Sequence, residues 1–268
     1  MGGDLSAYAE RIGYRGGFRA DPDTLRALHL AHATHIPFEN VDVLMGRPIE
    51  LDMESLSRKL IHARRGGYCF EQNTLFAAVL DQCGFHVTRL AARVRWGAPA
   101  GAVRPRSHML LAVELDGETQ LADVGFGGEG LLWPVPLQIG EPSQQGAWRY
   151  RVVCEGDVYV LQAETPEGWL DLYGFTLEAQ YPVDYQVANY YTSTHPNSIF
   201  RRMLRVQIPG PERRLMLLNR KLVERTREGV TETLLRDESE LMKVLADRFG
   251  MRFPEGTRIP IEEAAGAF

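Results

Sequence analysis

The hydrophobic pattern of this 268-residue chain changes its period at about Phe85. Before that residue the apolar positions recur every three to four residues, which is the period of an amphipathic helix. Beyond it the apolar positions alternate with polar ones or the residues are β-branched, which is typical of strands. Neither pattern fits the other structure, so a helical region must precede a β region. This order disfavours a doubly wound sheet, in which strands and helices alternate.

Three helices are expected in the first region. Asp21-Pro22 is typical of an N-cap followed by proline at the first helical position. A second helix should cover about 52–64, where apolar residues keep helical spacing. A third should run over about 69–83 and end at Gly84, where a helix-ending glycine is favoured.

The β region contains five segments with strand periodicity, separated by turn-forming pairs such as Asp116-Gly117. This arrangement predicts an antiparallel sheet or small barrel. The five segments are His86–Val94, His108–Leu115, Thr119–Val124, Trp148–Cys154 and Val158–Ala163.

The last third of the chain mixes both patterns. Three short runs could form a β-meander, and a helix should begin at Asp237 and end at Gly250. The runs are Leu215–Leu218, Lys221–Arg225 and Val230–Leu235. Helical, β and mixed regions in this order predict an α+β protein of three subdomains.

The composition excludes several classes of protein. With 44% hydrophobic and 24% charged residues the chain resembles a folded globular protein. Its formal net charge of -5 argues against nucleic acid, which usually selects a basic face. No apolar run approaches the roughly 20 residues that span a bilayer, and the first residues lack the apolar stretch of a signal peptide. Three cysteines cannot form a disulfide framework, so we expect a cytoplasmic protein without nucleic-acid or membrane partners.

Cys69 lies at the expected start of the third helix, directly after Arg65-Gly66-Gly67-Tyr68. The free N–H groups and the dipole at a helix N-terminus favour an anion, and a thiol held there is more reactive. The alternative is a buried cysteine that serves as a small apolar side chain, the usual role of a single thiol. Cys83 and Cys154 lie within apolar patterns, and we expect both in the core.

A histidine and an aspartate that could serve this thiol lie in one predicted hairpin. A nucleophilic cysteine needs a base, and the base needs an orienting group. Asp116-Gly117 is a strong signal for a two-residue hairpin turn. Counting outward from it places His108 opposite Gly125, which leaves room for the ring, and diagonal to Asp123. Such diagonal neighbours lie roughly 7–8 Å apart between backbones, a gap that their side chains can bridge.

Taken alone, the pair could be a strand-end histidine and a carboxylate on a hydrated face. Its coincidence with a thiol at a helix N-terminus favours a catalytic role. The predicted triad is Cys69, His108 and Asp123.

A metal site at His29, His32 and His35 is another chemical possibility. The spacing puts His29 and His32 on one helical face, but His35 is about 120° away from it. No cysteine or carboxylate at ligand spacing completes a site, and the H-E-x-x-H motif is missing. We therefore expect packed or solvated histidines and no metal.

Five segments resemble motifs of the arylamine N-acetyltransferase family, bacterial type, and follow each other in the family's order. They are similar to its N-terminal segment, its nucleophile motif, its histidine strand, its aspartate strand and the stretch entering its last domain. The segments are Ile36-Pro37-Phe38-Glu39-Asn40, Arg65-Gly66-Gly67-Tyr68-Cys69-Phe70-Glu71, Ser107-His108-Met109-Leu110-Leu111, Ala122-Asp123-Val124-Gly125-Phe126-Gly127 and His195-Pro196-Asn197-Ser198-Ile199-Phe200. The C-terminal forty residues match more loosely.

The resemblance implies a helical bundle carrying the nucleophile (1–85), an antiparallel β-barrel carrying the histidine and the aspartate (86–195) and an α/β lid (196–268). The core would hold a cysteine-protease-like Cys–His–Asp triad. Acetyl-CoA would be the acyl donor of a ping-pong reaction through an acetyl-cysteine. The implied acceptors are arylamines and arylhydrazines for N-acetylation and N-hydroxyarylamines for O-acetylation, as in xenobiotic metabolism.

The same resemblance implies further site residues. Those along the coenzyme path would be Trp96, Ser107, Gly127 and Phe200, and those bordering the aromatic acceptor would be Phe38, Tyr68 and Phe126. The loop at 97–101 departs in detail from the family's pattern. No G-x-x-x-x-G-K-[ST] phosphate loop is present, so scattered cations would hold the nucleotide phosphates.

The alternative function is a Cys-His-Asp hydrolase of papain or transglutaminase type, which would pass the acyl group to water. The papain signature C-G-[SA]-C-[WY] is absent from the chain. A homologue that only binds is a third possibility, and the presence of all three triad residue types argues against it.

Overall fold

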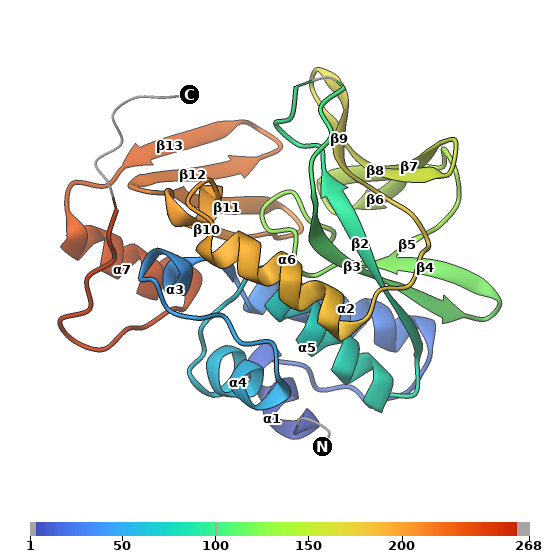
Figure 1. The fold of residues 1–268 in the computed structure, drawn as a ribbon, viewed down its shortest axis with the longest axis horizontal. Helices are drawn as coiled ribbons and strands as arrows, with labels where there is room; N and C mark the ends of the chain where they lie inside the picture. The colour runs from blue at the N-terminus through green and yellow to red at the C-terminus, as the bar shows by residue number, and fades with distance from the viewer. Residues whose placement is uncertain (1–3, 100, 262–268) are drawn as a thin grey trace.

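The computed structural model describes residues 4–99 and 101–261, which form two sheets and a set of helices (Figure 1). The helices are α1 (Leu5–Ile12), α2 (Pro22–His35), α3 (Val41–Leu44), α4 (Met53–Leu56), α5 (Cys69–Gln82), α6 (Pro182–Thr194) and α7 (Glu238–Phe249), with a π-helical turn at Ser57–His62 and a 3₁₀ turn at Ile199–Arg201. The strands are β1 (Phe38–Glu39), β2 (His86–Val94), β3 (Arg106–Leu115), β4 (Glu118–Ala122), β5 (Val135–Pro136), β6 (Ser143–Gln145), β7 (Trp148–Glu155), β8 (Val158–Thr165), β9 (Gly168–Phe175), β10 (Arg205–Ile208), β11 (Arg213–Leu218), β12 (Lys221–Thr226) and β13 (Val230–Leu234).

The larger sheet is a curved, barrel-like layer of eight strands in the order β5-β4-β3-β2-β9-β8-β7-β6. Each named pair of neighbours is antiparallel. Alternate side chains along β7 turn inward, and the core of this sheet is filled by large residues such as Tyr150 of β7, Leu161 of β8 and Tyr173 of β9. The predicted antiparallel barrel is therefore confirmed, and so is the α+β class.

The β3–β4 hairpin has the predicted register. Its two turn residues, Asp116 and Gly117, have φ angles of 52° and 81°, as a type I′ turn requires. Leu115 pairs with Glu118, and the ladder continues outward to the end of β4 at Ala122. The aspartate that the site needs is thus the first residue beyond β4.

The three helices predicted in the first region are present, whereas α1 and α3 were not predicted individually. The Asp21 side chain accepts a hydrogen bond from the Thr24 N–H at 2.7 Å and caps α2. The helix expected over 52–64 is α4 continued by the π-helical turn. Helix α5 ends before Gly84, whose φ is 88°, and it packs on β2 and β3.

The smaller sheet combines one strand of the N-terminal region with four strands of the C-terminal region. Its order is β1-β10-β11-β12-β13, so the predicted meander is confirmed and extended. Strand β1 comes from the N-terminal region and pairs with β10, with Phe38 opposite Gln207. Helix α7 lies on this sheet through a core that includes Leu241, Leu245 and Phe249. The segment after α2 is therefore held in the C-terminal sheet.

Helix α6 was not expected from the sequence. It lies beside β3 (Figure 1) and buries Tyr185 and Asn189 against the molecule. Its other face exposes Val183, Val187 and Tyr190 to solvent. Because apolar residues lie on both faces, the helix has no clear amphipathic stripe.

The turn that sets the register should be sensitive to glycine replacement. A Cβ at Gly117 meets no atom within 4 Å, but its φ of 81° is unfavourable for other residues. We expect Gly117→Ala to lower the free energy of unfolding by about 1 kcal/mol, measured by urea denaturation. Gly17→Ala is the matched control, because that site is equally open and has no positive φ. Equal stabilities of the two variants would contradict this account.

Candidate active site

Cys69 is the first residue of α5, as predicted. Tyr68 precedes it in an extended conformation and forms the N-cap position. The Cys69 side chain is only 4% exposed, and its Sγ lies 3.7 Å from the carbonyl oxygen of Ser107. The thiol therefore lies between the start of a helix and the start of the β3 hairpin strand.

Two glycines bring the turn before Cys69 against β1. A Cβ at Gly66 would lie 2.0 Å from the Pro37 carbonyl oxygen, and one at Gly67 would lie 2.7 Å from the Glu71 carboxylate. The Gly67 carbonyl accepts a hydrogen bond from the Glu39 N–H at 3.0 Å. No larger residue fits this close approach, so the Gly-Gly pair is required by packing.

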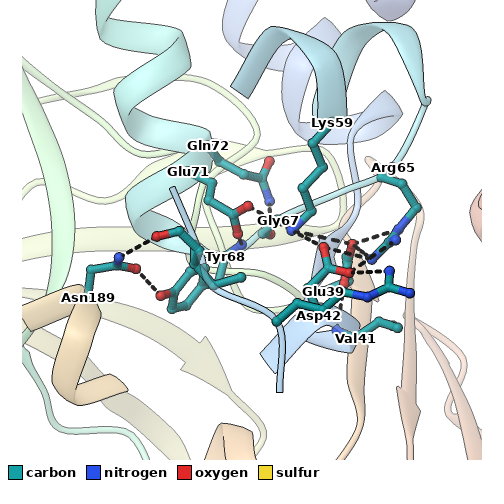
Figure 2. A network of polar contacts seen from close by, with 12 residues as sticks. Glu39, Val41, Asp42, Lys59, Arg65, Gly67, Tyr68, Glu71, Gln72 and Asn189 are labelled. Atoms are coloured by element: carbon teal, nitrogen blue, oxygen red, sulfur yellow. Dashed lines mark hydrogen bonds and ion pairs between the residues drawn. The ribbon is translucent and has the colours of Figure 1, made fainter. Parts of the chain in front are cut away.

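A buried ionic cluster holds the same turn (Figure 2). Arg65 Nη2 lies 2.6 Å from Glu39 Oε1. Lys59 Nζ lies 2.9 Å from Asp42 Oδ2 and 2.7 Å from Glu71 Oε1. These ion pairs connect β1, α3, the π-helical turn and α5. They therefore hold the Arg65–Tyr68 segment between the π-helical turn and α5.

The charges in this cluster depend on each other. Burial would lower the pKa of Lys59, but the three carboxylates around it, Glu71 first, raise it above its ordinary value. Burial raises the pKa of Glu71, and Lys59 opposes that shift. Glu71 Oε2 also accepts the N–H of Tyr68 at 3.0 Å, which is the helix-side half of a capping box. The cluster therefore supplies the hydrogen-bond acceptor for the backbone N–H of Tyr68, the residue before Cys69.

His108 and Asp123 form the predicted pair. His108 Nε2 lies 2.7 Å from Asp123 Oδ2, and the two side chains are 3% and 1% exposed. The β2–β3 ladder shifts register here, because Ala92 pairs with His108 and Arg93 with Arg106. Ser107 is thus the extra residue of a β-bulge, which turns its carbonyl toward the thiol.

The pair is ionic. Burial would lower the pKa of His108, but the charge and hydrogen bond of Asp123, together with Cys69, raise it to about 10. Burial would raise the pKa of Asp123, but His108 and further hydrogen bonds hold it below its ordinary value. The ring is therefore an imidazolium at neutral pH. Since Nε2 faces Asp123, Nδ1 is the nitrogen left for the thiol.

Asn73 belongs to the site, although it was not predicted from the sequence. Its Nδ2 donates to Asp123 Oδ1 at 2.9 Å and to the Met109 carbonyl at 2.7 Å. Its Oδ1 accepts the Val124 N–H at 3.1 Å. Asn73 follows Cys69 by four residues, so both lie on one face of α5. That spacing was the only available signal for it.

Gly125 differs from the expectation. A Cβ there would lie 2.7 Å from both Cys69 Cα and Asn73 Nδ2. The missing side chain therefore makes room for the start of α5. The sequence had predicted that it makes room for the His108 ring. The Gly125 N–H also donates to Asp123 Oδ1 at 2.9 Å.

Aromatic rings enclose His108. The Phe126 ring meets it edge-on at 5.2 Å between centroids, and the Tyr173 ring lies at 4.8 Å. Trp96, expected along the coenzyme path, lies 6.0 Å from the Phe126 ring. Tyr173 comes from β9 and was not anticipated.

The other predicted acceptor residues form a second aromatic group. The Phe200 ring lies 5.8 Å from both the Phe38 and the Tyr68 rings. Tyr68 is fully buried, and its hydroxyl donates to Asn189 Oδ1 on α6. The structure thus brings predicted coenzyme and acceptor residues together, at Phe200 and Phe38.

Gly127 lies in the loop after Asp123, with φ of 92°. A Cβ there would meet Gln207 Oε1 at 2.2 Å and the Phe38 ring at 3.2 Å. The neighbouring Gly128 N–H donates to Gln207 Oε1 at 3.0 Å. This loop is therefore docked on β10.

Two other expectations concern histidines and thiols. His29 and His32 are packed in the core, and the described residues contain no group of three metal-ligating side chains. Cys83 is buried as expected, but Cys154 is exposed. Its placement in the core was wrong, because it lies near the end of β7, where alternation no longer ensures coverage. Within the described part of the chain no helix could cross a membrane.

The chain is similar to known proteins over most of its length. A family model described as N-acetyltransferase matches residues 21–257. The arylamine N-acetyltransferase of Escherichia coli strain K12 is 41% identical, over 92% of this chain and 88% of its own. An arylamine N-acetyltransferase / N-hydroxyarylamine O-acetyltransferase of Salmonella typhimurium is 39% identical, over 85% and 82%. The structure of the Mycobacterium marinum arylamine N-acetyltransferase in complex with CoA is similar with a TM-score of 0.89 and 40% identity, covering 92% of this chain and 93% of that one.

The ionic pair gives a prediction for pH. Asp123→Asn should lower the pKa of His108 from about 10 to below its ordinary 6.5, because burial then acts without the carboxylate. An NMR titration of the ring should show it charged at pH 7 only in the wild type. Unchanged titration would contradict the pairing.

The same shift predicts how stability depends on pH. Folding raises the pKa of His108, so the pair stabilises the fold fully below pH 6.5 and loses this effect as pH rises toward 10. The difference in free energy of unfolding between wild type and Asp123→Asn should shrink over that range. A constant difference would contradict the coupling.

Proposed function

This chain belongs to the arylamine N-acetyltransferase family, and we propose that it transfers acetyl groups from acetyl-CoA to aromatic amines through a thioester on Cys69. The observation that carries the proposal is the buried arrangement in which Cys69 faces the strand of His108, and His108 is paired with Asp123. The triad roles follow from this arrangement. The substrates are inferred from the reaction of the family.

In the first half-reaction the Cys69 thiolate forms a bond to the thioester carbonyl carbon. The first-turn N–H groups of α5, which have no helical partners, are available to stabilise the oxyanion. His108, an imidazolium held by Asp123, gives its Nδ1 proton to the departing thiolate of coenzyme A. The products are acetyl-Cys69, the free thiol of coenzyme A and a neutral His108.

In the second half-reaction His108 is the base. It accepts a proton from the acceptor nitrogen as that nitrogen attacks the acetyl carbon. The bond to Cys69 breaks, the thiolate returns, and the imidazolium–thiolate pair is restored. N-hydroxyarylamines would be O-acetylated by the same steps, an activity that the name of the Salmonella relative includes.

We assign the nucleophile to a helical part at 1–85, the histidine and aspartate to the barrel at 86–195, and the closing surface to 196–268. Contacts of Phe126 with His108 and of Phe200 with Phe38 and Tyr68 support an aromatic acceptor slot that excludes water. Trp96, Ser107, Gly127 and Phe200 are assigned to the coenzyme path. The small separation of Trp96 and Phe126 supports a common entrance for both substrates.

The covalent carrier can be tested directly. After incubation with acetyl-CoA, mass spectrometry of the digested protein should find acetyl on Cys69, and Cys69→Ala should lose both the adduct and transfer. Cys154→Ala is the matched control, since that thiol is free but exposed, and it should retain full activity. An adduct on Cys83 or Cys154 would refute the assignment.

The acceptor class follows from the aromatic slot. An aniline or arylhydrazine arrives neutral at pH 7, whereas an alkylamine arrives as a cation that an apolar slot rejects because of desolvation. We expect strong preference for the aromatic amines in steady-state kinetics. Phe126→Ala should lower kcat/KM for them by about tenfold, and Tyr190→Ala, an exposed aromatic on α6, should not. Comparable turnover of alkylamines and anilines would contradict the arylamine specificity.

A further inference from the structure

Two histidines on α2 form hydrogen bonds next to the active site. His29 bonds to Asp123, and His32 bonds to Gln72 of α5. His29 and His32 are both 0% exposed. They are three residues apart, so their rings lie on one face of the helix, and each packs edge-on against Phe76 of α5. Neither has a role in the chemistry proposed above.

His29 holds the backbone of the aspartate. Its Nε2 lies 3.0 Å from the N–H of Asp123. A backbone N–H can only donate, so Nε2 accepts and carries no proton. The ring proton is therefore on Nδ1, which is buried in the interior.

His32 holds the turn before the nucleophile through Gln72. The Gly67 carbonyl can only accept, so Gln72 Nε2 donates to it at 2.9 Å. Gln72 Oε1 then faces His32 Nε2 at 3.2 Å and accepts its proton. Nδ1 of His32 consequently accepts from the Tyr8 hydroxyl at 2.7 Å. His32 is therefore the opposite tautomer of His29.

Burial keeps both rings neutral. It lowers the pKa of His29 to about 4, although Asp123 opposes the shift. It lowers the pKa of His32 to about 3, and His29, Arg11 and His35 act in the same direction while Gln72 opposes it. Each ring thus has one acceptor and one donor nitrogen at neutral pH; the Asp123 N–H requires the acceptor of His29, and Tyr8 and Gln72 require both nitrogens of His32.

We propose that His29 and His32 are positioning residues that set the distance between the aspartate end of the hairpin and the nucleophile turn. Helix α2 serves as the common support, with His29 in the Nδ1–H form bonded to Asp123 and His32 in the Nε2–H form bonded through Gln72 to Gly67. Their role in acetyl transfer rests on the proposed function, but their tautomers do not.

The first test is ¹⁵N NMR of the full-length enzyme labelled at histidine, at neutral pH without substrate. The ring shifts and couplings should identify His29 as Nδ1–H and His32 as Nε2–H, with His108 doubly protonated. Assignment uses His29→Gln and His32→Gln. The same tautomer in both rings, or the reverse order, would overturn the proposal. This experiment needs no activity.

The second test compares three variants on α2 by the rate of the first release of coenzyme A from acetyl-CoA. His29→Leu removes the acceptor, and His29→Gln keeps an oxygen near the position of Nε2. His35→Leu is the matched control, because His35 is on the same helix but exposed. His29→Leu should slow the release on the order of tenfold to a hundredfold, as loss of a supporting partner does around metal-ligating residues. It should also lower the pKa of His108.

His29→Gln should restore the rate to within a few-fold, and KM for the acceptor should change little in all three proteins. Equal rates for His29→Leu and His35→Leu, or equal losses for His29→Leu and His29→Gln, would overturn the positioning role. If His29→Leu fails to fold, the rate of His29→Gln and the tautomers measured by NMR test the proposal in its place. A wild-type enzyme that forms no acetyl-cysteine would instead refute the proposed function and leave the tautomers as they are.

Discussion

The charge of Asp123 in a dry interior is the constraint on which the rest of this site depends. A carboxylate that is 1% exposed loses several kcal/mol of hydration, which only a full set of partners can offset. His108 occupies one oxygen, and Asn73 and the Gly125 N–H occupy the other. These partners come from β3, α5 and the turn after β4. Satisfying one carboxylate therefore fixes the position of the hairpin relative to α5, the helix that begins with Cys69.

Buried polar side chains in the first turns of α5 are likewise paired with partners around Cys69. Glu71, two residues after Cys69, is buried beside Lys59 and caps the N–H of Tyr68. Gln72 bonds back to the Gly67 carbonyl. Together with Asn73 these side chains point in three directions around the helix. The position of Cys69 is thus fixed by hydrogen bonds and an ion pair of the three side chains that follow Phe70.

The sequence predicted features that depend on near neighbours. The register of the His108 hairpin follows from a two-residue turn and a strict period of two, so its partners could be counted. Asn73 bonds to Asp123, 50 residues away, and the short strand β1 pairs with β10, about 170 residues away, and no local pattern indicates either contact. Helix α6 was missed because Val187 and Tyr190 are exposed, so its apolar residues do not mark a single buried face. Cys154 was misplaced because alternation identifies a face of a strand but not whether that face is covered.

The C-terminal sheet acts on the same site through the loop after Asp123. Glu129 in this loop is buried between two guanidinium groups, Arg214 of β11 and Arg225 of β12. Gln207 of β10 holds the same loop at Gly128. An acidic residue paired twice at depth cannot shift without uncovering two cations. The loop that carries Phe126 is therefore anchored to the C-terminal sheet, and Phe126 contacts His108. The N-terminal helices, the eight-stranded sheet and the C-terminal sheet thus all contribute to the position of one imidazole, the last of them through the loop that carries Phe126.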